Sequence, residues 1–175
     1  MNLYLIGYRG SGKTTVAARL GALLGWKWLD ADDEIERRAG KSIKEIFAAS
    51  GEEAFRDLEA QVVTDLAKLQ QHIVALGGGA ILREENRHHL AQSGKVAWLR
   101  ASPEVLFRRI SDDTATAQRR PNLTAGGGLE EVRRMLAVRT PIYAACADLT
   151  LDAEAASPNA IADEIVLWLR KEAAG

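Results

Sequence analysis

Residues 7–14 read GYRGSGKT and match the pattern G-x-x-x-x-G-K-[ST] at every position. An apolar run, Leu3–Ile6, precedes this stretch, and a helix-forming run, Val16–Leu24, follows it. In that context the glycines let successive backbone N–H groups converge on phosphate oxygens, and the helix N-terminus adds partial positive charge. A simple glycine turn beside a surface lysine is the alternative, which the flanking strand and helix disfavour. The stretch therefore predicts a nucleoside triphosphate site, with Lys13 at the β- and γ-phosphates and Thr14 as a ligand of Mg²⁺.

Short apolar runs recur along the chain and are separated by longer segments with helical spacing. These runs are Leu3–Ile6, Lys27–Leu29, Ile73–Leu76, Val96–Leu99 and Leu149–Leu151. Most are continuous rather than alternating, which is typical of strands covered on both faces. The pairs Ser102-Pro103 and Ser157-Pro158 each supply an N-cap followed by a proline at the first helical position. The pattern predicts an α/β fold with a parallel sheet flanked by helices.

The composition limits the classes of function. The chain has 175 residues and a net charge of −1, which predicts one domain over 1–175 and leaves no basic excess to hold nucleic acid or anionic lipid. No apolar run approaches the ~20 residues of a membrane span. A lone cysteine, Cys146, cannot form an internal disulfide and fits a reducing compartment. We therefore expect a cytoplasmic protein without a nucleic-acid or membrane partner.

A polar segment interrupts the α/β pattern between Ser111 and Gly128. It contains Arg119-Arg120-Pro121 and a run of glycines, with almost no large apolar residue. A stretch of this length in a compact domain is usually a functional lid or a disordered insertion. The paired arginines favour the first, so the segment predicts a mobile lid over about residues 111–127.

The class of phosphate-binding protein follows from what accompanies the loop. Neither Asn-Lys-x-Asp nor Asp-x-x-Gly, the strings of regulatory GTPases, occurs in the chain, and transporter ATPases have longer domains. A short chain with such a loop and a polar lid has the plan of a small-molecule or nucleotide kinase.

Three carboxylates follow the second apolar run, at Asp30, Asp32 and Asp33. The carboxyl ends of parallel strands present ligands, so these side chains are expected to face the binding crevice. Phosphoryl transfer needs one acidic group near Mg²⁺ and another near the hydroxyl that loses its proton. The alternative is an acidic helix start, because aspartate favours N-caps and first turns.

Two arginines occupy positions that suggest an anionic acceptor. Glu52, Arg56 and Glu59 fall on one flank of a helical apolar stripe, where either local ion pairs or an arginine aimed at a substrate would explain them. Arg139 falls near the middle of an apolar stripe, where a buried guanidinium needs an anion, unless Pro141 kinks the helix and releases it. A bound carboxylate is one bidentate partner for such an arginine.

Taken in order, the motifs of the chain resemble those of the shikimate kinase family. They are the loop GYRGSGKT, Asp30-x-Asp32, GEEAFRDLE at 51–59, GGGA at 77–80, Arg120-Pro-x-Leu123 and Arg139-x-Pro-x-Tyr143. The match extends over nearly the whole chain. The resemblance implies the three-layer P-loop NTPase fold of the nucleoside monophosphate kinases, with a five-stranded parallel sheet in the order 2-3-1-4-5. It also implies phosphoryl transfer from ATP to shikimate in aromatic amino-acid biosynthesis, by a monomer.

Roles for individual residues follow from the same resemblance. The nucleotide-binding set would be Gly10, Ser11, Gly12, Lys13, Thr14, Thr15, Arg109 and Arg120. Thr14 would ligate Mg²⁺, with Asp30 acting through water. The substrate-binding set would be Asp32, Arg56, Gly78, Gly79 and Arg139, within an acceptor-binding segment at about 30–60 and beyond it. Asp32, Lys13 and Arg120 would be the catalytic residues.

The chain departs from the family pattern at three places, and two other functions remain open. After the fifth apolar run, Asp152-Ala-Glu-Ala155 lacks the Asn-Arg pair often seen beside adenine in the family. Asp33 adds a third carboxylate where the family commonly has a neutral residue, and Arg119 doubles the lid arginine. A gluconate kinase shares the phosphate loop and the lid but fits the paired arginines less well. A non-catalytic ATP-binding module is the alternative from a different class.

Overall fold

Five parallel strands form the central sheet of the computed structural model, which describes residues 1–113 and 127–174. The sheet order is β2-β3-β1-β4-β5, which confirms the order that the resemblance implies. The strands are β1 (Asn2–Ile6), β2 (Lys27–Asp30), β3 (His72–Ala75), β4 (Gly94–Arg100) and β5 (Leu149–Asp152). Each predicted strand is confirmed, with bounds that differ by at most two residues. Most of the predicted lid, residues 114–126 with Arg119 and Arg120, lies outside the described part.

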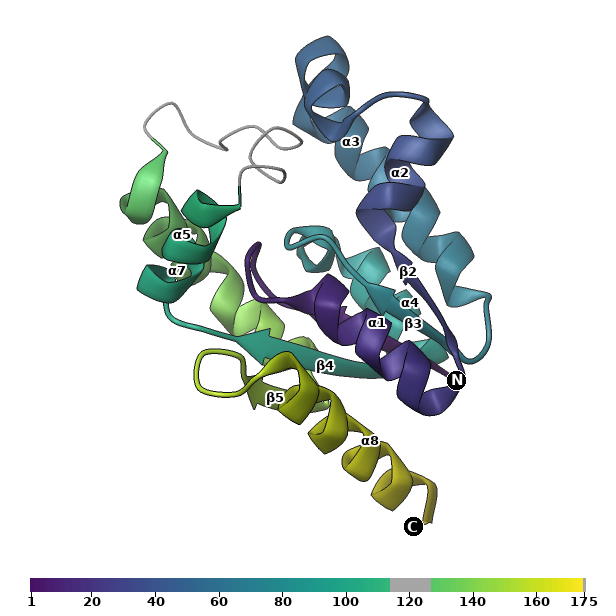
Figure 1. Ribbon diagram of the computed structural model, residues 1–175. Helices are drawn as coiled ribbons and strands as arrows, with labels where there is room; N and C mark the ends of the chain where they lie inside the picture. Colours follow the sequence, from purple (N-terminus) through teal and green to yellow (C-terminus); the bar gives the residue numbers. More distant parts are fainter. Residues whose placement is uncertain (114–126, 175) are drawn as a thin grey trace.

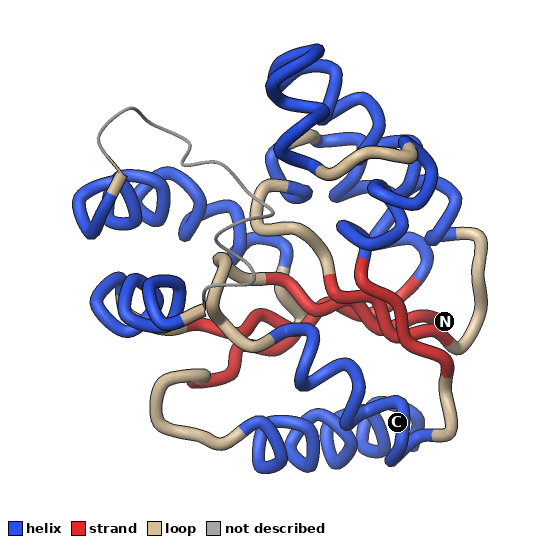
Figure 2. The backbone as a smooth tube through the Cα atoms, turned by 45° about the horizontal axis from the view of Figure 1, so that its top comes forward, coloured by secondary structure: helices blue, strands red, loops and turns tan. Residues whose placement is uncertain are grey.

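Helices cover both faces of the sheet and make a three-layer arrangement (Figures 1 and 2). They are α1 (Lys13–Leu24), α2 (Ala31–Ala39), α3 (Ile43–Ala67), the short 3₁₀ helix η1 (Ala80–Leu82), α4 (Glu84–Ser93), α5 (Pro103–Asp112), α7 (Gly128–Cys146) and α8 (Pro158–Ala174). Helices α1 and α8 pack together on one face. Helices α3, α4 and α7 lie on the other.

The central strand β1 shows why the chain forms this sandwich. Leu3 and Leu5 point into the core shared with α1 and α8, whereas Tyr4 and Ile6 point into the core shared with α3, α4 and α7. All four side chains are at most 1 % exposed. A strand that must be apolar on both faces gives the continuous apolar run seen in the sequence. Because β1, β2 and β3 run parallel to one another, the loops that follow them emerge at the same edge of the sheet.

Local signals place the helix boundaries. The Ser102 hydroxyl accepts a hydrogen bond from the backbone N–H of Val105 at 3.4 Å, and the Ser157 hydroxyl accepts one from Ala160 at 3.2 Å. Both predicted N-caps are therefore confirmed.

Two helices depart from the simplest expectation. Helix α3 begins eight residues before Gly51, which interrupts it with the non-helical angles φ 79° and ψ 178°. Glycine has no β carbon and takes such angles at little cost. Helix α7 continues through Pro141, and Arg139 remains buried on it. Pro141 therefore does not release Arg139 from its buried position.

In the described part of the chain, no helix is both long and apolar enough to cross a membrane.

Candidate active site

The loop between β1 and α1 forms a cradle at the edge of the sheet. Gly10 and Gly12 adopt positive φ angles of 83° and 89°, which favour glycine. A β carbon on Gly10 would lie 3.1 Å from the Ile110 side chain, so α5 packs closely over the loop. The Lys13 ammonium group donates to the carbonyl oxygens of Gly7 at 2.8 Å and Tyr8 at 3.0 Å. The Lys13 side chain thus lies across the loop, at the place where phosphate is predicted to bind.

The cradle opens into a cavity of about 400 Å³. Its lining includes the predicted nucleotide residues Gly10, Gly12, Lys13, Thr14, Thr15 and Arg109, together with Asp30, Asp32 and Asp33. Ser11 is buried in the loop itself. The Arg109 guanidinium donates to the Ala153 carbonyl oxygen at 2.8 Å, which ties α5 to the loop after β5.

The Thr14 hydroxyl donates to the Asp30 carboxylate at 2.7 Å, so two oxygen groups meet at the base of the cradle. The other Asp30 oxygen accepts from the Asp32 backbone N–H at 2.9 Å and caps α2. The interpretation of Asp30 as a helix start is therefore confirmed, and its place near Mg²⁺ stays a prediction, although Asp30 does line the cavity. Within the described residues, no group of three or more His, Cys, Asp or Glu side chains is arranged to hold a metal ion. One hydroxyl and one carboxylate fit Mg²⁺, which keeps several waters and takes phosphate oxygens as ligands.

A second cavity, of about 280 Å³, adjoins the first. We call the first the phosphate cavity and the second the acceptor cavity, after the residues predicted to lie there. Asp32, Arg56, Gly78 and Gly79 line it, so the structure brings together four of the five predicted acceptor residues. Asp32 also lines the phosphate cavity and therefore stands between the two. Its place as the second residue of α2, two residues after β2 ends, explains this position.

Arg56 is held at the wall of the second cavity by a buried ion pair. Its guanidinium contacts the Glu59 carboxylate at 2.6 Å, and Glu59 is 2 % exposed. Burial raises the pKa of the Glu59 carboxyl, and the adjacent Arg56 guanidinium opposes that shift. A β carbon on Gly79 would lie only 2.4 Å from the nearest Arg56 nitrogen. The glycine therefore leaves the space that this arginine occupies.

Arg139 reaches the same region from α7 and is 4 % exposed. Its guanidinium carbon lies 5.6 Å from the centroid of the Tyr8 ring, and one of its nitrogens lies 3.4 Å from where a Gly78 β carbon would be. Tyr8 and Gly78 both line the second cavity, so Arg139 lies behind its wall. Among the described residues, the Nε atoms of Arg56 and Arg139 are buried without a hydrogen-bond partner. Buried donors of this kind fit an anion that arrives with a ligand.

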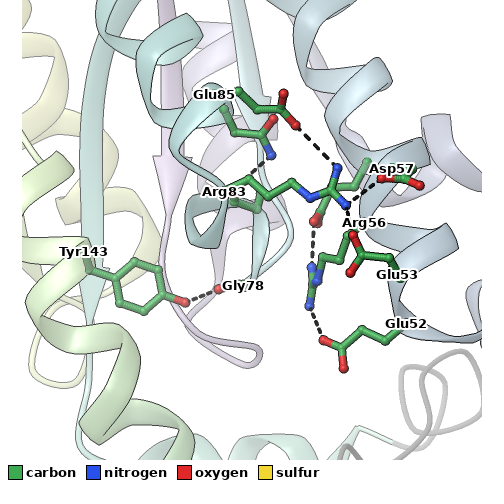
Figure 3. Close-up of polar contacts among 11 residues, drawn as sticks. Glu52, Glu53, Arg56, Asp57, Gly78, Arg83, Glu85 and Tyr143 are labelled. Carbon is green, nitrogen blue, oxygen red and sulfur yellow. Dashed lines mark hydrogen bonds and ion pairs between the residues drawn. The ribbon is translucent and has the colours of Figure 1, made fainter.

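Two further contacts hold the loop after β3. The Tyr143 hydroxyl donates to the Gly78 carbonyl oxygen at 2.5 Å (Figure 3). The Tyr143 ring also stacks on Trp98. Arg83, just after η1, pairs with Glu53 and Asp57 of α3 at 2.7 and 2.6 Å (Figure 3). The glycine loop is thereby fixed against α7 and α3, the helices that carry Arg139 and Arg56.

Sequence reasoning missed part of the cavity lining. Apolar side chains from three helices complete the second cavity: Ile43, Phe47, Phe55, Phe107, Ile110 and Val132. Two charged residues, Arg9 and Glu131, also line it. Arg9 had a visible signal, because a charged residue stands there among the small residues of the phosphate loop.

Comparison with known proteins identifies the family. The family model described as shikimate kinase matches residues 9–170. The chain belongs to the shikimate kinase family. Members of this family transfer the γ-phosphoryl group of ATP to shikimate.

Individual relatives agree with that assignment. The shikimate kinase of Rhodopirellula baltica is 46 % identical over 165 residues, which cover 94 % of this chain and 88 % of the relative. That of Nitrosococcus oceani is 39 % identical over 174 residues, 99 % of this chain and 90 % of the relative. The solved structure of the shikimate kinase from Acinetobacter baumannii in complex with shikimate has a TM-score of 0.90 and 35 % identity, and covers 98 % of this chain and 93 % of its own.

Proposed function

We propose that this chain transfers the γ-phosphoryl group of ATP to the 3-hydroxyl group of shikimate, giving shikimate 3-phosphate and ADP on the route to chorismate. The observation that carries the proposal is the pair of adjoining cavities that share Asp32. One cavity is built for phosphate, and the other carries Arg56 with Arg139 behind its wall. A substrate with one carboxylate and several hydroxyls matches that arrangement.

The acceptor is held at one end and reacts at the other. Arg56 and Arg139 would bind the shikimate carboxylate through guanidinium donors that include the unpartnered Nε atoms. Gly78 and Gly79 leave room for the ring, and the apolar lining contacts its carbon face. The 3-hydroxyl would then lie beside Asp32, which accepts a hydrogen bond from it and orients its lone pair toward the γ-phosphorus.

The transfer itself needs alignment and charge stabilisation more than covalent chemistry from the protein. The hydroxyl oxygen forms a new bond to the γ-phosphorus, the bond to the β,γ-bridging oxygen breaks, and its electron pair leaves with ADP. The hydroxyl proton passes to the Asp32 carboxylate. Lys13 would move from the Gly7 and Tyr8 carbonyls onto the phosphate oxygens.

Mg²⁺ and the lid belong to the same proposal. Thr14 would hold Mg²⁺ directly and Asp30 through water, and the ion would neutralise phosphate charge. Arg109 would flank the nucleotide, and Arg120 of the lid, outside the described residues, would contact the phosphates. We further propose that the chain acts as a cytoplasmic monomer, with residues 30–60 as its acceptor-binding segment.

A single assay tests the function. ADP release from ATP and Mg²⁺ is measured with shikimate, with gluconate and without an acceptor. We expect release that depends on shikimate alone. Release with gluconate only would overturn the acceptor assignment, and ATP binding without turnover would indicate a non-catalytic module.

A further inference from the structure

Arg9 lies in the phosphate loop at the boundary between the two cavities. Of the four described residues that line both cavities, it is the one cation and Asp32 is the one anion; the other two are Ile43 and Ile110. The backbone nitrogen of Arg9 lies 3.5 Å from the position of a Gly78 β carbon, which places the residue where the loops after β1 and β3 meet. A group passing from one cavity to the other would pass this side chain.

The side chain of Arg9 forms no ion pair with the described residues, unlike those of Arg56 and Arg83. Arg83 and Arg56 make ion pairs at 2.6 Å, whereas no ion pair within 4.0 Å joins Arg9 to another described residue. Its Nε atom is buried and has no hydrogen-bond partner in the described part of the chain.

Arg9 carries its charge in a partly buried position, where carboxylates offset only part of the cost of burial. Burial lowers the pKa of the Arg9 guanidinium, and the negative charges of Asp113 and Glu131 oppose that shift in part. Glu131 lines the acceptor cavity and is 6 % exposed, and Asp113 lines the phosphate cavity. Because a guanidinium is effectively always charged in proteins, Arg9 keeps its positive charge, and its buried Nε donor remains available to a ligand.

We propose that Arg9 contacts the transferring phosphoryl group and stabilises its charge midway between ADP and the acceptor oxygen. The proposal rests on the function proposed above. The acceptor carboxylate already has Arg56 and Arg139, whose positions are set by Glu59 and by Tyr8. The β-phosphate and γ-phosphate in the ground state have the loop N–H groups and Lys13. Arg120 of the lid lies outside the described residues, and among the described residues that line both cavities Arg9 is the one cation, so it borders the midpoint of the transfer.

This role predicts a particular kinetic signature. A group that acts only on the charge of the transition state lowers kcat and kcat/KM together when it is removed, and leaves KM nearly unchanged. Arg9→Met should lower kcat by about 10²-fold or more. Arg9→Lys keeps the charge but loses the planar donor fork, so it should lower kcat by a smaller factor. Arg19→Met, at an exposed position of α1, is the matched control and should behave as the wild-type chain does.

A binding measurement separates this role from a structural one. The probe is MgADP with shikimate and aluminium fluoride, whose anion occupies the place of the transferring group. In Arg9→Met the affinity for this complete mixture should fall about as much as kcat does. The affinities for MgADP alone and for shikimate alone, and the thermal unfolding midpoint, should match those of Arg19→Met.

Each other result has a defined meaning. Wild-type kcat in Arg9→Met, or a raised KM for shikimate with kcat unchanged, would overturn the inference while the proposed function stands. An equal loss of all three affinities with a lowered unfolding midpoint would make Arg9 a structural residue and would also overturn it. Absence of shikimate-dependent ADP release from the wild-type chain would overturn the proposed function and this inference with it.

Discussion

The phosphate cradle takes its shape from one continuous stretch, residues 7–14, whereas the acceptor cavity is assembled from residues that are far apart in the chain. In the cradle, backbone groups would do most of the binding on the function proposed above, and glycines with positive φ set the path of the loop. In the acceptor cavity, side chains from α2, α3 and α7 would do the binding, next to the glycines of the loop after β3.

This difference determines how each region responds to change. Backbone donors in a short loop depend on the local conformation of that loop. Substitution of most surrounding side chains should therefore change phosphate binding little. Side-chain donors such as Arg56 and Arg139 depend on the packing of whole helices. Asp32 belongs to both cavities, and substitutions there should affect the reaction rather than either binding step.

The largest effect is expected for Asp32→Asn. The amide cannot accept the hydroxyl proton, so kcat should fall by about 10²- to 10⁴-fold while the affinity for ATP is retained. Steady-state kinetics and nucleotide titration give both quantities. Asp163→Asn, at an exposed position of α8, serves as the control. A kcat within twofold of wild type would remove Asp32 from the chemistry.

Arg139→Ala should separate the two cavities most clearly. It removes a charged donor from the acceptor side alone, so KM for shikimate should rise on the order of 10²-fold while KM for ATP is nearly unchanged. Arg139→Lys should have a KM for shikimate between those of the wild type and Arg139→Ala, because lysine keeps a point charge but lacks the planar pair of donors of a guanidinium. Unchanged shikimate kinetics in Arg139→Ala would contradict the carboxylate assignment.

Gly79→Ala tests whether close packing sets the acceptor site. The new β carbon would meet the Arg56 guanidinium, which Glu59 holds in place, so the arginine must shift. KM for shikimate should rise about tenfold, a smaller effect than loss of a charged donor. In an Arg56→Ala background the same substitution should have little further effect. An equal rise in both backgrounds would show that Gly79 acts independently of Arg56.

The smallest effect is expected in the scaffold of the acceptor side. Glu34 pairs with Arg37 and Arg38, and Arg38 pairs with Asp65, which joins α2 to α3. The Arg37 and Arg38 guanidinium groups lower the pKa of the Glu34 carboxyl from 4.5 to about 2. Glu34→Gln should lower the free energy of unfolding at pH 7 by about 1 kcal/mol and leave kcat unchanged.

The pH dependence of that difference has a definite sign. A carboxyl whose pKa is lower in the folded state stabilises the fold above its unfolded pKa and loses that contribution as pH falls. The difference between wild type and Glu34→Gln should therefore be constant above about pH 5 and shrink from there toward pH 2. Urea unfolding at several pH values measures it. Glu164→Gln, exposed on α8, is the control, and a difference that grows on acidification would contradict the assigned pairs.

The phosphate cradle could be predicted from the sequence more completely than the acceptor cavity. The loop at 7–14 and the strand–helix alternation were readable because each is a local pattern with one structural solution. Arg56 and Arg139 were flagged by their helical positions, but periodicity alone left open whether they serve local ion pairs or a ligand. The structure shows that Arg56 does pair with Glu59, and that it faces the cavity as well.

The sequence by itself determined the sheet, its covering helices and the phosphate cradle, because hydrophobic periodicity and a contiguous glycine pattern act over short distances. Only the tertiary structure decided that Asp32 and Arg9 border both cavities. It alone also decided that Gly79 clears the space for Arg56 and that Tyr143 holds the loop at Gly78. These contacts join residues up to 65 positions apart. They depend on how helices pack across the sheet, which no local pattern encodes.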